Sequence, residues 1–163
     1  MIDTNHWREL FADEQLTRQR AFAQYTDDII ATIAKLPGYS WCGFYWVVGD
    51  TLHLGAWRGP HATEHVAIPV GQGICGAAVT SRETVIVDDV TKDPRYLQCF
   101  LSTKSEIVVP IYTDGDPSKD VIGEIDIDSD KTGMFTSDDR LQLEKLATLI
   151  GKFYPTGFDP RLV

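Results

Sequence analysis

Apolar residues recur along this chain at two spacings, one typical of helices and one typical of strands. Between residues 11 and 36 they recur every three or four positions, at Phe22, Tyr25, Ile29, Ile33 and Leu36. This spacing predicts an amphipathic helix, which Pro37-Gly38 should end. A second helix is predicted over residues 137–154, with its apolar stripe at Leu143, Leu146, Ile150 and Phe153. Thr136 and Asp139 suit a capping box at its start.

The chain between these helices has the composition of short strands. Six segments rich in aromatic and β-branched residues are predicted to be strands: 40–48, 51–57, 64–70, 84–90, 105–112 and 120–128. Gly49-Asp50 favours a tight hairpin between the first two. The glycines that open residues 71–81 predict a loop entering a short helix. Residues 91–104 should form a long polar connection with one helical turn at 96–98.

This order of elements predicts an α+β domain. Strands linked mostly by hairpins form an antiparallel sheet, here of about six strands, with the N- and C-terminal helices packed on one face. The other face, under the 91–104 loop, is then free to hold a ligand. A length of 163 residues fits one domain, with residues 1–11 as an N-terminal extension and 155–163 as a C-terminal tail.

Composition narrows the range of partners. The formal net charge is −9 and the pI about 4.7, so the surface should repel phosphate, which argues against nucleic acid and anionic membranes. Three cysteines do not suggest a disulfide framework. The N-terminus has no signal-peptide pattern, and no apolar run is long enough to span a bilayer. We therefore expect a soluble, cytoplasmic protein with reduced thiols.

The stretch EIDID at 124–128 places acids and isoleucines on opposite faces of a strand, because side chains alternate. A half-exposed strand with its acids in water would give the same pattern. The neighbouring strand favours another interpretation. A hairpin with Tyr112 opposite Ile122 sets Glu106 opposite Asp128, whereas a shift by one residue sets Glu106 on the apolar face, at a cost of several kcal/mol.

Glu106, Asp126 and Asp128 should therefore converge on one patch. Three carboxylates so near one another repel, which raises the pKa of at least one of them and favours the binding of a cation. The histidines show no spacing typical of metal ligands, so an organic ammonium is a better expectation than a metal, and we expect no cofactor. Trp41 and Tyr45 share a face of the first strand, where Gly43 between them should leave a slot for a thin ligand.

The three cysteines differ in their settings. Cys42 lies among large apolar residues of a strand and should be inert. Cys75 follows glycines at a helix entry and Cys99 ends a loop, and in both places backbone N–H groups could lower a thiol pKa. From the residues alone, either could be reactive.

Several stretches together resemble a known family. They are WCGFYW, GQGICGAAV, SEIVVPI, IGEIDIDS and the polar loop between Asp89-Val90 and Cys99. These stretches resemble a GAF domain, and within that fold the chain is similar to the free methionine-(R)-sulfoxide reductases over residues 41–153. The specific part is the Cys-x6-Glu spacing of Cys99 and Glu106 combined with Asp126-x-Asp128.

The resemblance implies roles for individual residues. Cys99 matches the catalytic cysteine, and the pocket carboxylates and aromatics match Glu106, Asp126, Asp128, Trp41 and Tyr45. Cys75 matches a cysteine discussed as a disulfide partner. A further cysteine, which often serves as the resolving thiol, is missing from the segment GPHATEHVAIP. The resemblance also implies pairing through the helices into a homodimer.

The implied activity is reduction of free L-methionine (R)-S-oxide, a repair of oxidative damage. A Cys99 thiolate would attack the sulfoxide sulfur while Glu106 or Asp128 protonates its oxygen. Asp126 or Asp128 would hold the substrate ammonium, loop amides its carboxylate and Trp41 its methyl group. The Cys99 sulfenic acid would be resolved by Cys75, with thioredoxin reducing the disulfide, or directly by an external thiol. The alternatives are a non-enzymatic GAF sensor of a small molecule and a thiol redox switch.

Overall fold

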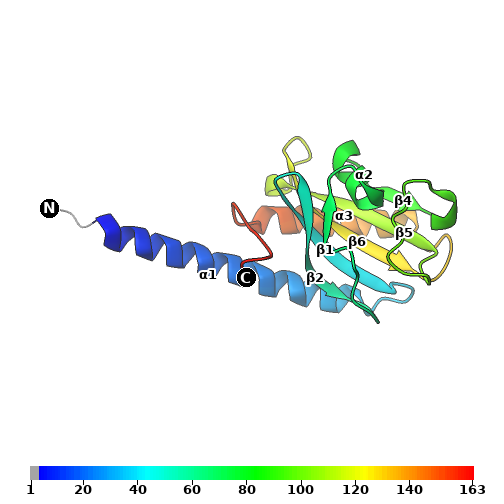
Figure 1. The fold of residues 1–163 in the computed structure, drawn as a ribbon, viewed down its shortest axis with the longest axis horizontal. Helices are drawn as coiled ribbons and strands as arrows, with labels where there is room; N and C mark the ends of the chain where they lie inside the picture. The colour runs from blue at the N-terminus through cyan, green and yellow to red at the C-terminus, as the bar shows by residue number, and fades with distance from the viewer. Residues whose placement is uncertain (1–3) are drawn as a thin grey trace.

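The computed structural model describes residues 4–163 (Figure 1). Its helices are α1 (Thr4–Ile33), α2 (Gly73–Ser81) and α3 (Ser137–Phe153). Its strands are β1 (Trp41–Val48), β2 (Thr51–Arg58), β3 (Ala67–Pro69), β4 (Val85–Val87), β5 (Ser105–Tyr112) and β6 (Val121–Ser129). Two short 3-10 turns occur at Val90–Lys92 and Thr113–Gly115.

The strands form one sheet in the order β3-β2-β1-β6-β5-β4, and every neighbouring pair is antiparallel. Hairpins join β1 to β2 and β5 to β6, while β1 and β6 pair in the middle of the sheet. The predicted antiparallel sheet of about six strands is confirmed.

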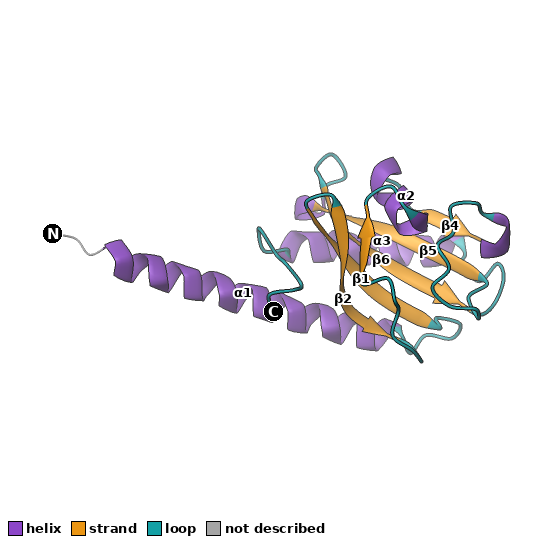
Figure 2. Cartoon of the chain, in the orientation of Figure 1, coloured by secondary structure: helices purple, strands orange, loops and turns teal. Residues whose placement is uncertain are grey.

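Alternation along the strands separates a core face from a site face. Phe44, Trp46 and Ile125 point to the core face, where α1 and α3 cover them with Phe22, Ile30, Leu143 and Ile150. Trp41, Tyr45 and Val108 point to the site face, which α2 partly covers. Figure 2 shows α3 behind the sheet and α2 in front of it. The predicted placement of the terminal helices on one face is therefore confirmed.

Helix α1 begins at Thr4 and ends at Ile33, so Leu36 lies beyond it and is exposed. The predicted stripe was wrong at this end, because the chain leaves the helix before Pro37-Gly38. Phe22 and Ile30 of this helix are buried in the core, and the predicted stripe residues Ile29 and Ile33 pack against it partly buried, whereas Tyr25 is exposed. The N-terminal half of α1 projects beyond the sheet (Figure 1).

The C-terminal part of the chain is anchored at both ends. Thr136 and Asp139 form the predicted capping box of α3, and the Tyr39 hydroxyl donates a hydrogen bond to Asp139 at 3.0 Å. After α3, Phe158 returns to the core and packs edge-on against Phe22 and Trp46. Among the residues that the structure describes, no helix is long and apolar enough to cross a membrane.

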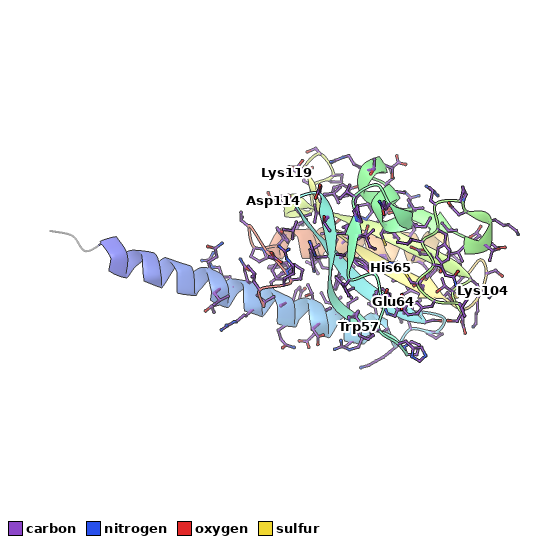
Figure 3. All side chains as sticks on the ribbon, viewed as in Figure 1. Trp57, Glu64, His65, Lys104, Asp114 and Lys119 are labelled. Carbon is purple, nitrogen blue, oxygen red and sulfur yellow. The ribbon has the colours of Figure 1, made fainter. Side chains whose placement is uncertain are left out.

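The register of the β5–β6 hairpin decides where the acids lie. Glu106 lies opposite Asp128, as predicted, and Ile107 lies opposite Ile127. The predicted pair of Tyr112 with Ile122 is wrong, because a bulge after Ile111 sets Tyr112 opposite Val121. The bulge lies at the loop end of the hairpin, near the Asp114–Lys119 ion pair (Figure 3), and leaves the register at the acids unchanged.

The long connection before β5 also differs in one detail from the prediction. Its single helical turn is at Val90–Lys92 and not at 96–98. Asp89 fixes it there, because its side chain accepts a hydrogen bond from the Thr91 N–H at 3.1 Å.

Candidate active site

Four carboxyl groups lie buried on the site face of the sheet. Glu124, Asp126 and Asp128 project from alternate positions of β6, and Glu106 projects from β5 opposite Asp128. None of these side chains is more than 5% exposed. The alternative of a half-exposed strand with solvated acids is therefore wrong, since α2 and the loops above the sheet exclude water from them.

Glu124 is the member of this cluster that the sequence analysis left out of the site. It lies opposite Tyr45 of β1 and Pro110 of β5 and is fully buried. Neither of its carboxyl oxygens has a hydrogen-bond partner, and Asp126 Oδ1 also has none. The alternation in the sequence already places Glu124 on the same face as Asp126. That Glu124 is the most deeply buried of the four follows only from the pairing of β6 with β1 and β5, which no local pattern shows.

Burial raises the pKa of every carboxyl in the cluster. The pKa of Glu124 rises to about 8 through burial, and that of Asp126 to about 8 through burial and the charge of Glu124. The pKa values of Glu106 and Asp128 are also raised, first by burial and then by Asp126. Mutual repulsion, the cause expected from the sequence, is thus the smaller effect. The cluster holds protons near neutral pH.

The cluster has no basic partner among residues 14–163. Each ion pair within that range joins other residues, and Arg95, in the loop above, pairs with Asp93. Cys75 Sγ and one carboxyl oxygen each of Glu106 and Asp126 lie within 4.8 Å of one another. These atoms could surround a metal ion or an ammonium group, because either would supply the missing positive charge.

Two of the three cysteines adjoin the acids. Cys75, in the first turn of α2, is buried, and its thiol donates a hydrogen bond to Asp126 Oδ2 at 3.5 Å. Cys99 is half-buried within the 93–104 loop above, and its thiol donates to the Leu97 carbonyl at 3.5 Å. Asp126, Asp128 and Glu106 all act on the pKa of Cys99, so both thiols lie close to the carboxyl cluster.

The predicted lowering of these thiol pKa values is wrong. Burial and then the charges of Asp126 and Glu124 raise the pKa of Cys75. Burial and then Asp126 and Asp128 raise that of Cys99, although a hydrogen bond from Thr63 acts in the opposite direction. The acids and the loss of water outweigh any help from backbone N–H groups, so both cysteines are protonated near neutral pH.

Cys42 lies on the core face of the sheet, as predicted. It is fully buried among Phe44, Ile107 and Ile127. Burial and then Asp126 and Asp128 raise its pKa to about 12. Its position and its protonation agree with an inert, space-filling role.

The aromatic wall of the site is formed as predicted, but its slot is not. Trp41 stacks on Trp57 with ring centroids 6.3 Å apart and an interplanar angle of 12°, and it also contacts Phe100 at 6.0 Å. A Cβ atom at Gly43 would lie 2.3 Å from the Trp41 ring. The expected slot over Gly43 is therefore filled by the Trp41 indole. Gly43 allows that ring to lie flat on the sheet.

Two loops lie over the site. The Tyr45 hydroxyl donates to the carbonyl of His65 at 2.7 Å, and His65 Nε2 lies 3.2 Å from the Gln98 carbonyl. His65 follows β2, the strand that carries Trp57 (Figure 3). A Cβ at Gly73 would lie 3.3 Å from Leu97, so the 93–104 segment rests on the start of α2. The residues Trp57, His65, Leu97 and Phe100 were not found from the sequence, because they reach the site from separate segments.

Comparison with known proteins identifies the family to which this fold belongs. The GAF domain family matches residues 23–152. The chain is 36% identical over 122 residues to the free methionine-R-sulfoxide reductase of Escherichia coli, covering 75% of this chain and 70% of the relative. The chain belongs to the GAF domain family.

Solved GAF structures agree with this assignment. A type II free methionine-R-sulfoxide reductase from Thermoplasma acidophilum has a TM-score of 0.78 at 37% identity, covering 83% of this chain and 94% of that one. The reductase from Neisseria meningitidis, solved in complex with its substrate, has a TM-score of 0.74 at 35% identity, covering 81% and 77%. This GAF domain is thus similar in sequence and in fold to free methionine-R-sulfoxide reductases.

Proposed function

We propose that this protein reduces free L-methionine (R)-S-oxide to L-methionine. The observation that carries the proposal is a half-buried thiol, Cys99, over four buried carboxyl groups that have no basic partner within residues 14–163. This arrangement supplies a nucleophile, protons for an oxygen and a place for a cation. The relatives named free methionine-R-sulfoxide reductases support the same activity.

In the proposed reaction, oxygen passes from the substrate to Cys99. The Cys99 sulfur attacks the sulfoxide sulfur after a carboxylate of the cluster takes its proton, and Glu106 or Asp128 protonates the sulfoxide oxygen. The attack forms a bond between the two sulfur atoms. The hydroxyl then moves from the substrate sulfur to the Cys99 sulfur, so the S–S bond and the substrate S–O bond break while an S–O bond forms on Cys99. The substrate sulfur has then gained two electrons, which gives methionine, and the Cys99 sulfur, now in a sulfenic acid, has lost two.

The cluster also supplies a means of substrate recognition. The ammonium group of a free amino acid provides the positive charge that Asp126 or Asp128 lacks, while N–H groups of the 93–104 loop bind its carboxylate. The S-methyl group packs against Trp41, with Tyr45 on the same wall. Peptide linkage removes both charged groups, so peptide-bound sulfoxide should be a poor substrate.

Regeneration through Cys75 is the favoured route. Cys75 attacks the Cys99 sulfenic acid, a disulfide forms and the oxygen leaves as water after taking a proton from the cluster. Both thiols lie over Asp126, and the loop that carries Cys99 rests on Gly73, two residues before Cys75. Thioredoxin or a similar dithiol in a reducing cytoplasm would reopen the disulfide. In the other route an external thiol reduces Cys99 directly.

Pairing through the helices completes the proposal. The N-terminal half of α1 projects from the domain (Figure 1), and isolated helical segments are marginal in water. Tyr25 and Phe153 meet with ring centroids 6.3 Å apart and line a groove between α1 and the end of α3. We propose that a second copy of the chain covers this face. Light scattering of the wild type should give a dimer, and Phe153→Asp should give more monomer.

The activity test couples turnover to NADPH consumption through thioredoxin and thioredoxin reductase. Free methionine-R-sulfoxide should be turned over, and the S epimer and a peptide-bound sulfoxide far less. Cys99→Ser should be inactive but still bind substrate, whereas Cys42→Ser should keep its turnover. Equal rates on free and peptide-bound sulfoxide would contradict the proposal. Binding without turnover by the wild type would favour a sensor.

The route of regeneration is tested by mass spectrometry after one turnover without reductant. A Cys75–Cys99 disulfide supports the internal route. A lasting sulfenic acid at Cys99, with Cys75 still open to alkylation, excludes it.

A further inference from the structure

A turn in the 93–104 loop orients one tyrosine toward the site. The Tyr96 N–H donates to the Asp93 carbonyl at 3.1 Å, and Pro94 occupies the second position of this turn, which its fixed φ favours. The Asp93 side chain accepts from the Arg95 N–H at 2.9 Å and pairs with the Arg95 guanidinium at 2.6 Å. The turn is thus held at several points, and the Tyr96 ring packs against the apolar side chains of the site face.

The Tyr96 hydroxyl is a buried donor without an acceptor. Its oxygen is shielded from solvent and has no hydrogen-bond partner. The hydroxyls of four other tyrosines each donate a hydrogen bond, and these are Tyr39, Tyr45, Tyr112 and Tyr154. A buried tyrosine hydroxyl normally finds a partner. The Tyr96 hydroxyl is therefore the one buried tyrosine hydroxyl among residues 14–163 that is left without a hydrogen-bond acceptor.

Tyr96 lies near the residues that are proposed to carry out the reaction. After burial, the groups that raise its pKa, to about 12, are Asp128, Glu106 and Cys99, while the nearby Thr103 side chain lowers it. These three are the proposed nucleophile and the two proposed acids. The phenol therefore stays neutral across physiological pH and keeps its proton to donate.

We propose that the Tyr96 hydroxyl donates a hydrogen bond to the sulfoxide oxygen of the bound substrate. This inference rests on the proposed function and adds a further catalytic residue to it. The oxygen gains negative charge while the Cys99 sulfur attacks, so the hydrogen bond strengthens toward the transition state. Tyr96 holds the oxygen toward Glu106 and Asp128, one of which delivers the proton, and itself transfers none.

Tyr96→Phe tests the proposal because it removes one oxygen atom and keeps the ring. Single-turnover formation of methionine should slow by about 10²-fold, as when one donor to a developing oxyanion is lost. KM should change by no more than about threefold, since the hydrogen bond matters most in the transition state. Tyr112→Phe is the matched control and should react at the wild-type rate, because the Tyr112 hydroxyl bonds to the Arg82 carbonyl.

A second measurement separates this role from a structural one. An aromatic disulfide reagent reacts with Cys99 without any sulfoxide oxygen, so Tyr96→Phe should leave this rate unchanged. An equal loss in both reactions would show that Tyr96 acts only by shaping the loop, and would overturn the inference. So would a wild-type rate of methionine formation, or a higher KM at unchanged kcat. If the wild type forms no methionine, the proposed function has failed, and this outcome is distinct.

Discussion

Burying a carboxyl without a basic partner is unfavourable, and this protein buries four on one face of β5 and β6 that have none among residues 14–163. Burial alone keeps each carboxyl protonated to a higher pH, and the neighbours add to the effect. The roles of the individual residues then depend on what each touches. Asp126 accepts a hydrogen bond from Cys75 and also lies near Cys99, while Glu106 and Asp128 both lie near Tyr96.

Substitution of single acids should separate proton transfer from binding. Glu106→Gln and Asp128→Asn should each slow sulfenic acid formation by about 10²-fold or more, because an amide cannot donate the proton that the oxygen needs. Asp126→Asn should mainly weaken substrate binding. Rapid-quench measurement of the first turnover at several substrate concentrations distinguishes the two effects. A slower first turnover in Asp126→Asn at saturating substrate would contradict this division.

At the scale of elements, β1 contributes the flat backbone surface on which the Trp41 ring lies, because Gly43 has no side chain there. Gly43 lies directly under the Trp41 ring, and Gly59 approaches the same ring from the chain after β2. Trp57 and Phe100 fix the indole from two other segments. The aromatic wall therefore depends on the close approach of the indole to the backbone of β1.

Gly43→Ala should move the Trp41 ring, since the added Cβ would lie 2.3 Å from it. We expect kcat/KM for free methionine-R-sulfoxide to fall at least about tenfold, because a misplaced substrate loses its alignment with Cys99. Circular dichroism should show an intact sheet, and the tryptophan fluorescence should change. Unchanged kcat/KM would mean that Trp41 does not position the substrate.

The elements and the acid register could be predicted because their signals are local. Alternation in β6 and the cost of an acid on the apolar face together set Glu106 opposite Asp128. The bulge at Tyr112 has no such signal, since it arises where the strand enters the loop. The Trp41 ring position depends on Trp57 and Phe100, and the raised thiol pKa values depend on burial under two loops. Packing between segments far apart in the chain produces no local pattern in the sequence, so it could not be predicted.

At the scale of the whole molecule, the acids couple folding to pH. The folded protein keeps protons on Glu124 and Asp126 up to about pH 8. The ordinary pKa values of these two side chains are 4.5 and 3.8. The unfolded chain loses these protons first. Between about pH 4 and 8 the folded state therefore binds more protons, and the free energy of unfolding decreases as the pH rises.

Glu124→Gln isolates the deepest of these groups. The variant removes a carboxyl whose folded pKa is raised. Its free energy of unfolding should therefore decrease less between pH 5 and 8 than that of the wild type, and the two decreases should differ by on the order of 3 kcal/mol. Urea unfolding at both pH values measures this difference. Glu64→Gln, on the exposed loop labelled in Figure 3, should keep the wild-type pH dependence. The same slope in Glu124→Gln as in the wild type would contradict the prediction.

Because the acids have no basic partner among residues 14–163, we expect them to give up protons when the ammonium group of a substrate binds. An arriving ammonium group favours the ionised carboxyls, so their protons must leave for the solvent as it binds. Calorimetric titration of Cys99→Ser, which cannot turn over, should show a binding enthalpy that increases with the ionisation enthalpy of the buffer. An enthalpy equal in phosphate and Tris would mean that the substrate enters without displacing a proton.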